Sequence, residues 1–261
     1  MNVIVTRPEL EARRWVQSLR SAGLQARALP LIDIRPAPDK AALQRACGDL
    51  RAGRYRAAMF VSANAVNGLW AADPELSQAF VSSALRAWAP GPGTCQALLA
   101  RGVPRVAIDT PDAHATQFDS ESLWQAVAGL VLPGQHVLVV RGGDARAGAT
   151  GAGREWLAQK LAAVGVSVDY LLAYQRACPS WDEDLQSQAQ LAAGDVSVWL
   201  FSSSEAVHNL QACLPQQSWA QARALTTHPR IAQAARAAGF GVVRESRPTL
   251  DDIRASIEWF Q

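Results

Sequence analysis

The sequence is poor in the residues that hold metals and disulfides. Its 261 residues include four cysteines and four histidines. The cysteines are widely separated and form no CxxC pair, and the histidines show no i, i+4 spacing. We therefore expect neither a structural metal nor a disulfide framework. No local motif indicates a Ser/His/Asp or Cys/His set for covalent catalysis.

Long hydrophobic runs are also missing. The longest apolar stretches, such as VLVV at residues 137–140, are far shorter than the about 20 residues that span a bilayer. The N-terminus turns charged at Arg7 and does not resemble a signal peptide. We expect a soluble, cytoplasmic protein that has no membrane partner.

Lysine is scarce, because Lys40 and Lys160 are the only two, whereas arginine is frequent. The net charge is +2, and no basic run is long enough to follow a nucleic-acid backbone. A nucleic-acid partner is therefore not expected. Arginine suits bidentate recognition of carboxylates, although a compositional bias toward Arg and Ala explains most of these residues equally well.

The glycine-rich stretch VLVVRGGDARAGATGAG at 137–153 lacks a phosphate-binding motif. Gly143 and Gly148 have P-loop spacing, but Ala149 and Thr150 stand where Lys-Ser/Thr is required, and no GxGxxG is present. We interpret the stretch as a mobile loop over a cleft, with an unstructured insertion as the alternative.

Short apolar runs alternate with amphipathic segments along the whole chain, which predicts an α/β fold with parallel sheets covered on both faces. We expect strands at residues 3–5, 57–61, 86–89, 105–108, 136–140, 196–201, 223–225 and 241–244. We expect helices at residues 9–22, 41–51, 63–71, 94–101, 120–129, 154–164, 182–193, 205–213, 230–238 and 250–260.

One strand-to-helix turn occurs twice in the sequence. FVSANAV at 60–66 matches FSSSEAV at 201–207, which places Ser62 on Ser203 at an offset of 141 residues. Trp15 matches Trp156 at the same offset, and ALLARGV at 97–103 resembles AARAAGF at 234–240. We interpret the chain as two copies of one α/β unit.

Two further segments, LPLIDIRPAP at 29–38 and VDYLLAYQRACP at 168–179, are rich in β-formers and end in proline. They occupy matching places in the repeat, so they are suited to pair with each other and to join two lobes. The predicted architecture is two similar three-layer α/β lobes with parallel sheets, joined by a two-stranded β linker.

The repeated turn is suited to anions, because Ser or Asn at a helix start leaves hydroxyls and backbone N–H groups unpaired. Plain N-capping without a ligand explains the same residues. APGPGT at 89–94 is a second such turn, with Thr94 placed to cap, and Thr226 and Thr227 occupy the position that we match to it. From the residues alone, we interpret Tyr174 on a linker strand as a packed aromatic whose hydroxyl faces water, and donation of a proton or hydrogen bond is the alternative.

Taken in order, these segments resemble the uroporphyrinogen-III synthase family over nearly the whole chain. The segments that carry the resemblance are VTRP at 5–8, LPLIDIRP, FVSANAV, the turn ending in Thr94, FDSESLW at 118–124, VVRG at 139–142, GREWLAQKL at 153–161, Tyr174-Gln175-Arg176 and FSSSEAV. The resemblance implies one discontinuous lobe of residues 1–35 and 176–261, a second lobe of 36–172, and linker strands at about 29–37 and 167–177.

The resemblance also implies a reaction without a cofactor. Hydroxymethylbilane, a linear tetrapyrrole with eight carboxylates, loses its terminal hydroxyl as water. The already substituted position of ring D attacks the resulting electrophile and gives a spiro intermediate, and fragmentation with reclosure inverts that ring. The product is uroporphyrinogen III of haem biosynthesis, whereas the unaided bilane closes to the uninverted isomer.

By this resemblance Tyr174 is the candidate that assists departure of the hydroxyl. The implied substrate-binding residues are Arg7, Ser62, Ala63, Asn64, Thr94, Arg141, Ser202, Ser203, Ser204 and Thr227. Two departures from the family pattern affect this set: extra residues follow Arg141-Gly142, and TTHPR at 226–230 replaces the usual turn, which leaves Thr226, Thr227 and Arg230 as alternatives.

The resemblance implies binding of hydroxymethylbilane, with a transient handover from hydroxymethylbilane synthase. We expect a monomer, because the apolar faces have partners within the same chain. The alternative from another class is a non-catalytic, two-lobed cytosolic binding protein for an anionic small molecule. A nucleotide-dependent transferase ranks third, because the phosphate loop is missing.

Overall fold

The computed structural model describes residues 1–82, 84–112, 120–144 and 152–260. The chain divides into two compact units: unit 1 comprises Met1–Asp33 and Ala177–Gln261, and unit 2 comprises Ile34–Arg176. The chain therefore passes from one unit to the other twice, once after Asp33 and once after Arg176.

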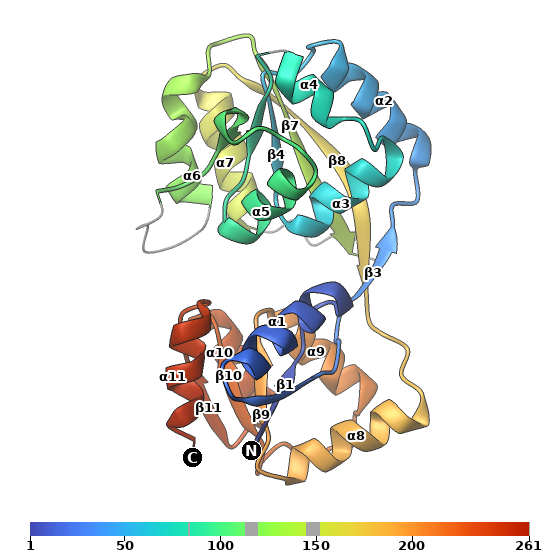
Figure 1. Cartoon of the computed structure of the whole chain (residues 1–261), viewed down its shortest axis with the longest axis vertical. Helices are drawn as coiled ribbons and strands as arrows, with labels where there is room; N and C mark the ends of the chain where they lie inside the picture. The colour runs from blue at the N-terminus through green and yellow to red at the C-terminus, as the bar shows by residue number, and fades with distance from the viewer. Residues whose placement is uncertain (83, 113–119, 145–151, 261) are drawn as a thin grey trace. The chain divides into compact units, whose positions relative to one another are not determined.

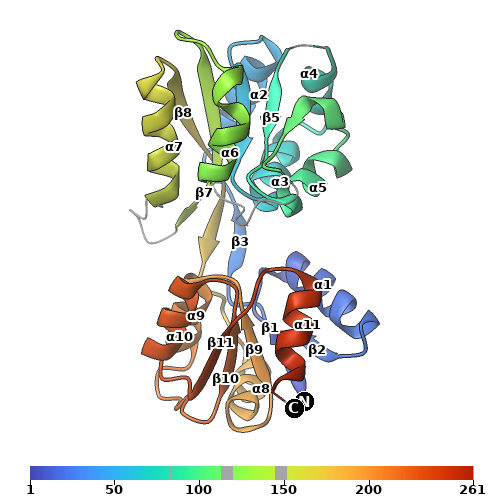
Figure 2. The same cartoon turned by 90° about the vertical axis from the view of Figure 1, so that its left-hand side faces the viewer.

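Unit 1 is a five-stranded sheet with helices on both faces (Figures 1 and 2). The strand order is β11-β10-β9-β1-β2, and every recorded pairing is parallel. Its elements are β1 (Asn2–Val5), α1 (Glu9–Ser21), β2 (Gln25–Ala28), α8 (Glu183–Gly194), β9 (Val198–Phe201), α9 (Ser204–Cys213), β10 (Arg223–Thr226), α10 (Pro229–Ala237), β11 (Val242–Glu245) and α11 (Leu250–Glu258).

Unit 2 is a six-stranded sheet with the order β3-β8-β7-β4-β5-β6. Its strands are β3 (Asp33–Pro36), β4 (Ala57–Phe60), β5 (Arg86–Trp88), β6 (Ile108–Asp109), β7 (His136–Asp144) and β8 (Ser167–Ala177). Its helices are α2 (Lys40–Arg51), α3 (Ala63–Ala72), α4 (Ser77–Ser82), α5 (Pro92–Ala100), α6 (Ser120–Val127) and α7 (Ala152–Ala163), with 3-10 turns at Arg105–Ala107 and Ala128–Leu130. The expected pairing of the two linker segments is seen, since β3 and β8 are hydrogen-bonded neighbours.

The two sheets have one strand order. When β1, β2, β9, β10 and β11 are matched with β7, β8, β4, β5 and β6, the orders coincide and β3 is the additional strand of unit 2. In each sheet the direction of strand addition reverses at one place, between β1 and β9 in unit 1 and between β7 and β4 in unit 2. Open α/β sheets bind ligands beyond the carboxyl ends of the strands at such a switch point.

Alternate residues of the central strands feed two cores in each unit, because successive side chains point to opposite faces. In unit 1, Val3 and Val5 pack with α1 and α11, while Trp199 and Phe201 belong to an aromatic cluster on the other face. In unit 2, α2, α3 and α5 cover one face, and α6 and α7 cover the other. The buried cores fix the ends of the strands, where the candidate residues lie.

One local prediction is wrong, and two elements were missed. Residues 105–107, expected in a strand, form a 3-10 turn that leads into the short strand β6, because Pro104, with φ −61°, starts the turn and the Arg105 guanidinium donates to the Ile108 carbonyl at 2.9 Å. The polar edge strand β2 and the six-residue helix α4 were not predicted. Of the glycine-rich stretch at 137–153, β7 takes residues up to Asp144, and residues 145–151 lie outside the described part.

Candidate functional site

The first repeated turn begins helix α3 with a serine cap. Ser62 has extended backbone angles, φ −164° and ψ 166°, and its hydroxyl accepts a hydrogen bond from the Ala65 N–H at 3.2 Å. Ala63 and Asn64 are the first two residues of α3, so their backbone N–H groups belong to its positive end. The strand that leads into this turn, β4, is buried along its whole length, which holds the turn in place.

Tyr174 meets this turn from another strand. Its hydroxyl lies 3.1 Å from the Ser62 hydroxyl, and either group can donate. Tyr174 is 6% exposed and belongs to β8, whereas Ser62 follows β4, with β7 between the two strands. The phenol therefore crosses the end of β7 at Gly142, the residue that pairs with it. The structure thus brings together two residues that the sequence places 112 positions apart.

Arg7 and Arg141 occupy equivalent positions in the two units, since VIVTR at 3–7 matches VLVVR at 137–141. Each guanidinium stacks on an aromatic ring, Arg7 on Trp15 at 4.8 Å and Arg141 on Tyr170 at 4.7 Å. Each also buries its Nε atom with no hydrogen-bond partner among the described residues. Burial of such an N–H donor costs free energy unless a ligand accepts its hydrogen bond.

The charge of Arg7 is only partly balanced within its own unit. Its Nη1 lies 3.4 Å from the Glu11 carboxylate, one helical turn along α1. Burial lowers the pKa of the Arg7 guanidinium, and the Glu11 carboxylate opposes that shift. The cation therefore lies in a poorly hydrated position, where an additional anion is favourable.

The expectation that Thr94 caps its helix is wrong. Helix α5 begins earlier, with Gly91 as the N-cap and Pro92 at its first position, so Thr94 is a buried residue inside the first turn. Proline suits a first helical position, because its missing N–H has no intrahelical partner there. The equivalent helix α10 starts in the same manner, with Pro229 following the N-cap.

The second repeated turn lies in unit 1. Ser203 caps α9 and accepts from the Glu205 N–H at 3.1 Å, with Ser202 before it and Ser204 as the first helical residue. Thr226 is fully buried, and its hydroxyl donates to the Arg244 carbonyl at 3.1 Å. Thr227 follows β10, and its N–H donates to the Phe201 carbonyl at 3.2 Å. Within the described part of the chain, the Ser202 and Ser204 hydroxyls make no hydrogen bond to the rest of the unit.

The two turns match as expected, because Pro92 and Pro229 open equivalent helices 137 residues apart. This offset places Ala89 and Pro90 on Thr226 and Thr227, and Thr94 on Ile231. His228 caps α10 instead, because its Nδ1 accepts from the Arg230 N–H at 3.1 Å. A histidine cap gave no signal in the sequence.

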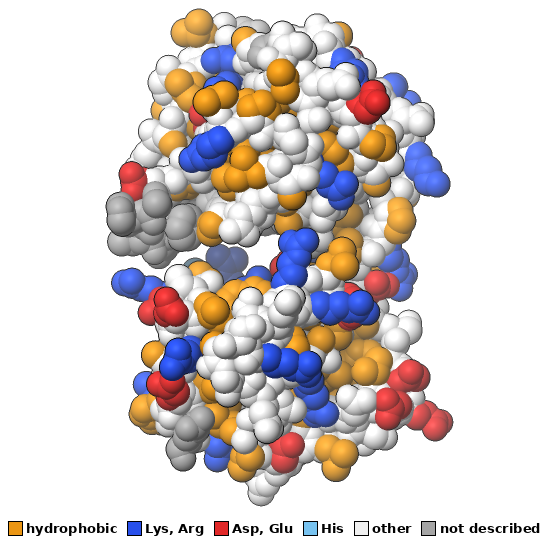
Figure 3. Space-filling view, viewed as in Figure 1, with side chains coloured by type: hydrophobic (Ala, Val, Ile, Leu, Met, Phe, Trp, Pro, Cys, Tyr) orange, Lys and Arg blue, Asp and Glu red, His pale blue; other side chains and the backbone are white. Residues whose placement is uncertain are grey.

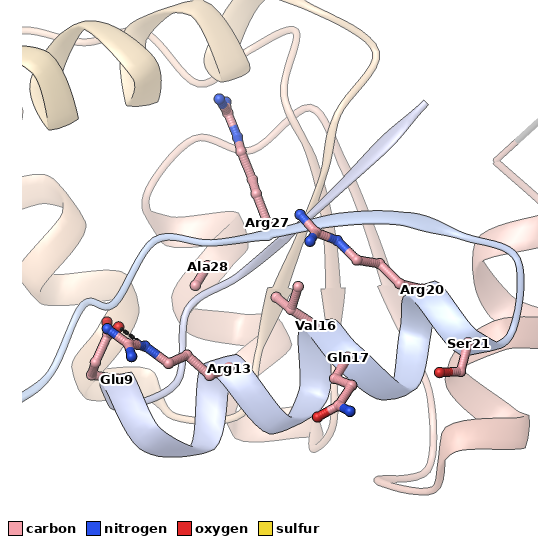
Figure 4. Close-up of a pocket in the computed structure, with 8 residues that line it drawn as sticks. All are labelled: Glu9, Arg13, Val16, Gln17, Arg20, Ser21, Arg27 and Ala28. Carbon is pink, nitrogen blue, oxygen red and sulfur yellow. Dashed lines mark hydrogen bonds and ion pairs between the residues drawn. The ribbon is translucent and has the colours of Figure 1, made fainter.

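A separate hollow of about 650 Å³ lies on unit 1 between α1 and β2. Figure 4 shows Arg13 paired with Glu9 at one end, and Arg20 reaching from α1 toward β2. The space-filling view shows basic side chains over this part of unit 1 (Figure 3), and they are arginines, because Lys40 and Lys160 both lie in unit 2. None of the sequence-predicted site residues lines the hollow, so we do not assign it to the reaction.

Among the described residues, no group of three or more His, Cys, Asp or Glu side chains is placed to hold a metal ion. No described helix has the length and apolar character needed to cross a bilayer.

A family model described as uroporphyrinogen-III synthase HemD matches residues 13–255. Two solved structures are similar over the whole length. A mutant uroporphyrinogen III synthase from Thermus thermophilus shares 15% identity, covers 100% of this chain and 98% of its own, and gives a TM-score of 0.56. The uroporphyrinogen-III synthetase from Helicobacter pylori shares 16% identity, covers 99% and 100%, and gives 0.59. These structures share the fold, and the family match extends over most of the sequence, so the chain belongs to the uroporphyrinogen-III synthase family.

Proposed function

We propose that this uroporphyrinogen-III synthase removes the terminal hydroxyl of hydroxymethylbilane with the help of the Tyr174 phenol. The observation that carries the proposal is the 3.1 Å hydrogen bond between Tyr174 and Ser62 at the start of α3. The enzyme cyclises the bilane to uroporphyrinogen III with loss of water. The alternative of a non-catalytic binding protein finds no support in the comparisons.

A short chain of hydrogen bonds supports the role of the phenol as a donor. The Ala65 N–H donates to the Ser62 hydroxyl. When Ser62 in turn donates to the Tyr174 oxygen, the phenolic hydrogen is left for the substrate. Hydrogen bonds in such a chain polarise one another, and the positive end of α3 acts in the same direction. Tyr174 thereby becomes a stronger donor than an isolated phenol.

In the proposed first step, the C–O bond of the terminal hydroxymethyl group breaks, and its electron pair leaves with the oxygen. The Tyr174 hydroxyl donates its proton to this oxygen as negative charge develops on it, so the group departs as water. Support at the moment when charge develops is worth more than support to the ground state. Ring D then attacks the electrophile at its substituted position and gives the spiro intermediate. The original bond between ring D and the chain breaks, the ring recloses in the inverted orientation, and the proton that the substrate loses on reclosure restores the phenol.

The arginines support the proposed handling of the substrate carboxylates. Arg7 and Arg141 each hold a buried Nε donor without a described partner, at equivalent places in their units. A carboxylate accepts two parallel hydrogen bonds from one guanidinium, which fixes orientation as well as position. The other proposed binding residues are Ser62, Ala63, Asn64 and Thr94 in unit 2, and Ser202, Ser203, Ser204 and Thr227 in unit 1.

We extend the proposal to the supply of substrate. Hydroxymethylbilane closes unaided to the uninverted isomer, so a bilane that diffuses freely is partly lost. A transient handover from hydroxymethylbilane synthase to this enzyme would limit that loss, and the chemical instability of the substrate supports it.

The test uses bilane made fresh by its synthase, mixed with the wild-type protein and with Tyr174→Phe, then oxidised and separated by isomer. Wild type is expected to give mostly type III porphyrin. Tyr174→Phe keeps the ring and loses only the hydroxyl, so kcat should fall about 10²-fold, in the range for loss of one general acid. Only type I from the folded wild-type protein would overturn the activity, and an unchanged kcat in Tyr174→Phe would overturn the role of the phenol.

A further inference from the structure

We propose that Gly142 and Gly68 are positioning residues that place the Tyr174 hydroxyl on Ser62. This inference rests on the proposed role of Tyr174. Neither glycine is in the set of substrate-binding candidates. Each occupies a point where a backbone comes so close to another group that a side chain has no room.

Gly142 provides the surface on which the phenol lies. A Cβ atom added at Gly142 would lie 2.6 Å from the Tyr174 Cε2 atom and 2.8 Å from its hydroxyl oxygen. Gly142 is not among the glycines with positive φ, so its backbone angles suit other residues as well. The need for glycine here is one of space. Because β7 lies between β8 and β4, any side chain at Gly142 stands in the path of the phenol toward Ser62.

A β-bulge in β8 directs the Tyr174 side chain toward Ser62. Arg141 pairs with Leu172, but Gly142 pairs with Tyr174, so Ala173 is an extra residue on β8. A bulge re-aims the side chains that follow it, because faces alternate along a strand. Leu172 is 40% exposed, whereas Ala173 and Tyr174 are both buried.

Gly68 lets helix α3 lie directly against this bulge. A Cβ atom added at Gly68 would lie 2.9 Å from the carbonyl carbon of Ala173 and 3.1 Å from its Cβ. Helix α3 also starts at the Ser62 cap, so this contact fixes Ser62 and Tyr174 through one helix. Gly68 therefore sets the distance between the bulge and helix α3, and Gly142 sets the orientation of the Tyr174 ring.

The experiment compares Gly142→Ala with Gly143→Ala in the isomer assay. The three nearest atoms to a Cβ atom at Gly143 would be the Leu172 methyl groups at 3.4 and 3.5 Å and the Tyr174 carbonyl oxygen at 3.9 Å, which makes this neighbour a matched control. Gly142→Ala should lower kcat at least about tenfold by moving the hydroxyl away from Ser62, with KM changed less than about twofold. Gly143→Ala should stay within about twofold of wild type in both constants, since its contacts are ordinary.

A double variant separates this inference from the proposed function. In the Tyr174→Phe background the hydroxyl is already absent, so Gly142→Ala should cause no further loss of kcat. A wild-type kcat for Gly142→Ala beside an impaired Tyr174→Phe would overturn the positioning role alone. Wild-type rates in both would overturn the role of the phenol. If Gly142→Ala does not fold, adding Tyr174→Leu removes the ring and should restore folding, and failure to do so would overturn the proposal.

Discussion

The turn after β4 and the turn after β9 are copies of each other down to their boundaries. Strand Ala57–Phe60 and helix Ala63–Ala72 in unit 2 correspond to Val198–Phe201 and Ser204–Cys213 in unit 1, each at an offset of 141 residues. Both helices begin at a serine cap. Three buried positions also coincide, because Ala65, Val66 and Leu69 match Ala206, Val207 and Leu210.

Among the positions where the two helices differ, one decides what each helix packs against. Gly68 corresponds to Asn209 at the offset of 141. In unit 1, the Asn209 side-chain amide donates to the Leu31 carbonyl at 2.8 Å. In unit 2, the Ala173 backbone lies directly against Gly68. Gly23 and Gly165 end equivalent helices with positive φ, and their offset of 142 matches Leu31 with Ala173.

The same offset of 142 matches Ile32 with Tyr174. In unit 1, the Asn209 side chain separates the segment at Leu31 from helix α9. In unit 2, Gly68 lets the segment at Ala173 lie directly against helix α3, which brings the Tyr174 hydroxyl to the Ser62 cap. The repeat supplies two equivalent helix ends suited to anions, and we propose that the exchanges of Gly68 for Asn209 and of Tyr174 for Ile32 give the chemistry to unit 2. The comparison teaches that a duplicated scaffold need not carry a duplicated reaction.

The largest effect is expected when unit 2 receives the residue of unit 1. Gly68→Asn forces a side chain into the backbone of Ala173, and overpacking of this kind costs up to about 3 kcal/mol. The free energy of unfolding from urea titration should fall by about that amount, and type III porphyrin formation should be largely lost.

Gly48 in the interior of α2 is the matched control, because a Cβ atom there would meet nothing within 4 Å. Gly48→Asn should change the stability by only a few tenths of a kcal/mol, as intrinsic helix propensities predict. Equal stabilities for Gly68→Asn and Gly48→Asn would remove the steric basis of the comparison.

A second difference between the units concerns Cys47, whose match at the offset of 141 is Gln188. Burial raises the pKa of the Cys47 thiol to about 11, with a further contribution from the Asp73 carboxylate and an opposing one from Arg51. The unfolded thiol, with its lower pKa, loses its proton first. The stability that Cys47 contributes is therefore present below about pH 9 and is lost as the pH rises toward 11.

Urea unfolding at about pH 8 and about pH 11 checks this expectation. From the shift in pKa, the wild-type protein should lose about 2 kcal/mol more than Cys47→Ala over this interval. Cys47 is 4% exposed, so screening by solvent reduces the effect little. The same loss in both proteins would assign the alkaline destabilisation to other groups.

Much of this fold follows from local patterns in the sequence. The alternation of strands and helices and the 141-residue repeat predicted two parallel α/β units, and serine after an apolar strand predicted both caps. The resemblance singled out Tyr174. The strand, helix and cap signals are local, and each depends on propensity or hydrophobic period within about 20 residues. The repeat and the resemblance instead compare whole segments along the chain.

What the sequence did not predict depends on contacts between distant segments. The meeting of Tyr174 with Ser62 needs the register of β8 on β7 and the extra residue in β8, which no local pattern specifies. Gly142 lies in the glycine-rich stretch at 137–153, which lacks a phosphate-binding motif and which we interpreted as a mobile loop. Cys178 and Cys213 are far apart in the chain, yet their sulfur atoms lie 3.7 Å apart.

The most direct test of the account is a double-mutant cycle in the isomer assay with Ser62→Ala, Tyr174→Phe and the combined variant. If Ser62 acts through the phenol, Ser62→Ala should lower kcat about fivefold, an effect of about 1 kcal/mol for one hydrogen bond. Thr249→Ala, which removes a hydroxyl cap from α11 in unit 1, controls for the loss of a cap at about 1 kcal/mol of stability. The account predicts that the combined variant is no slower than Tyr174→Phe alone. Losses that multiply would show that the two hydroxyls act independently and would contradict the account.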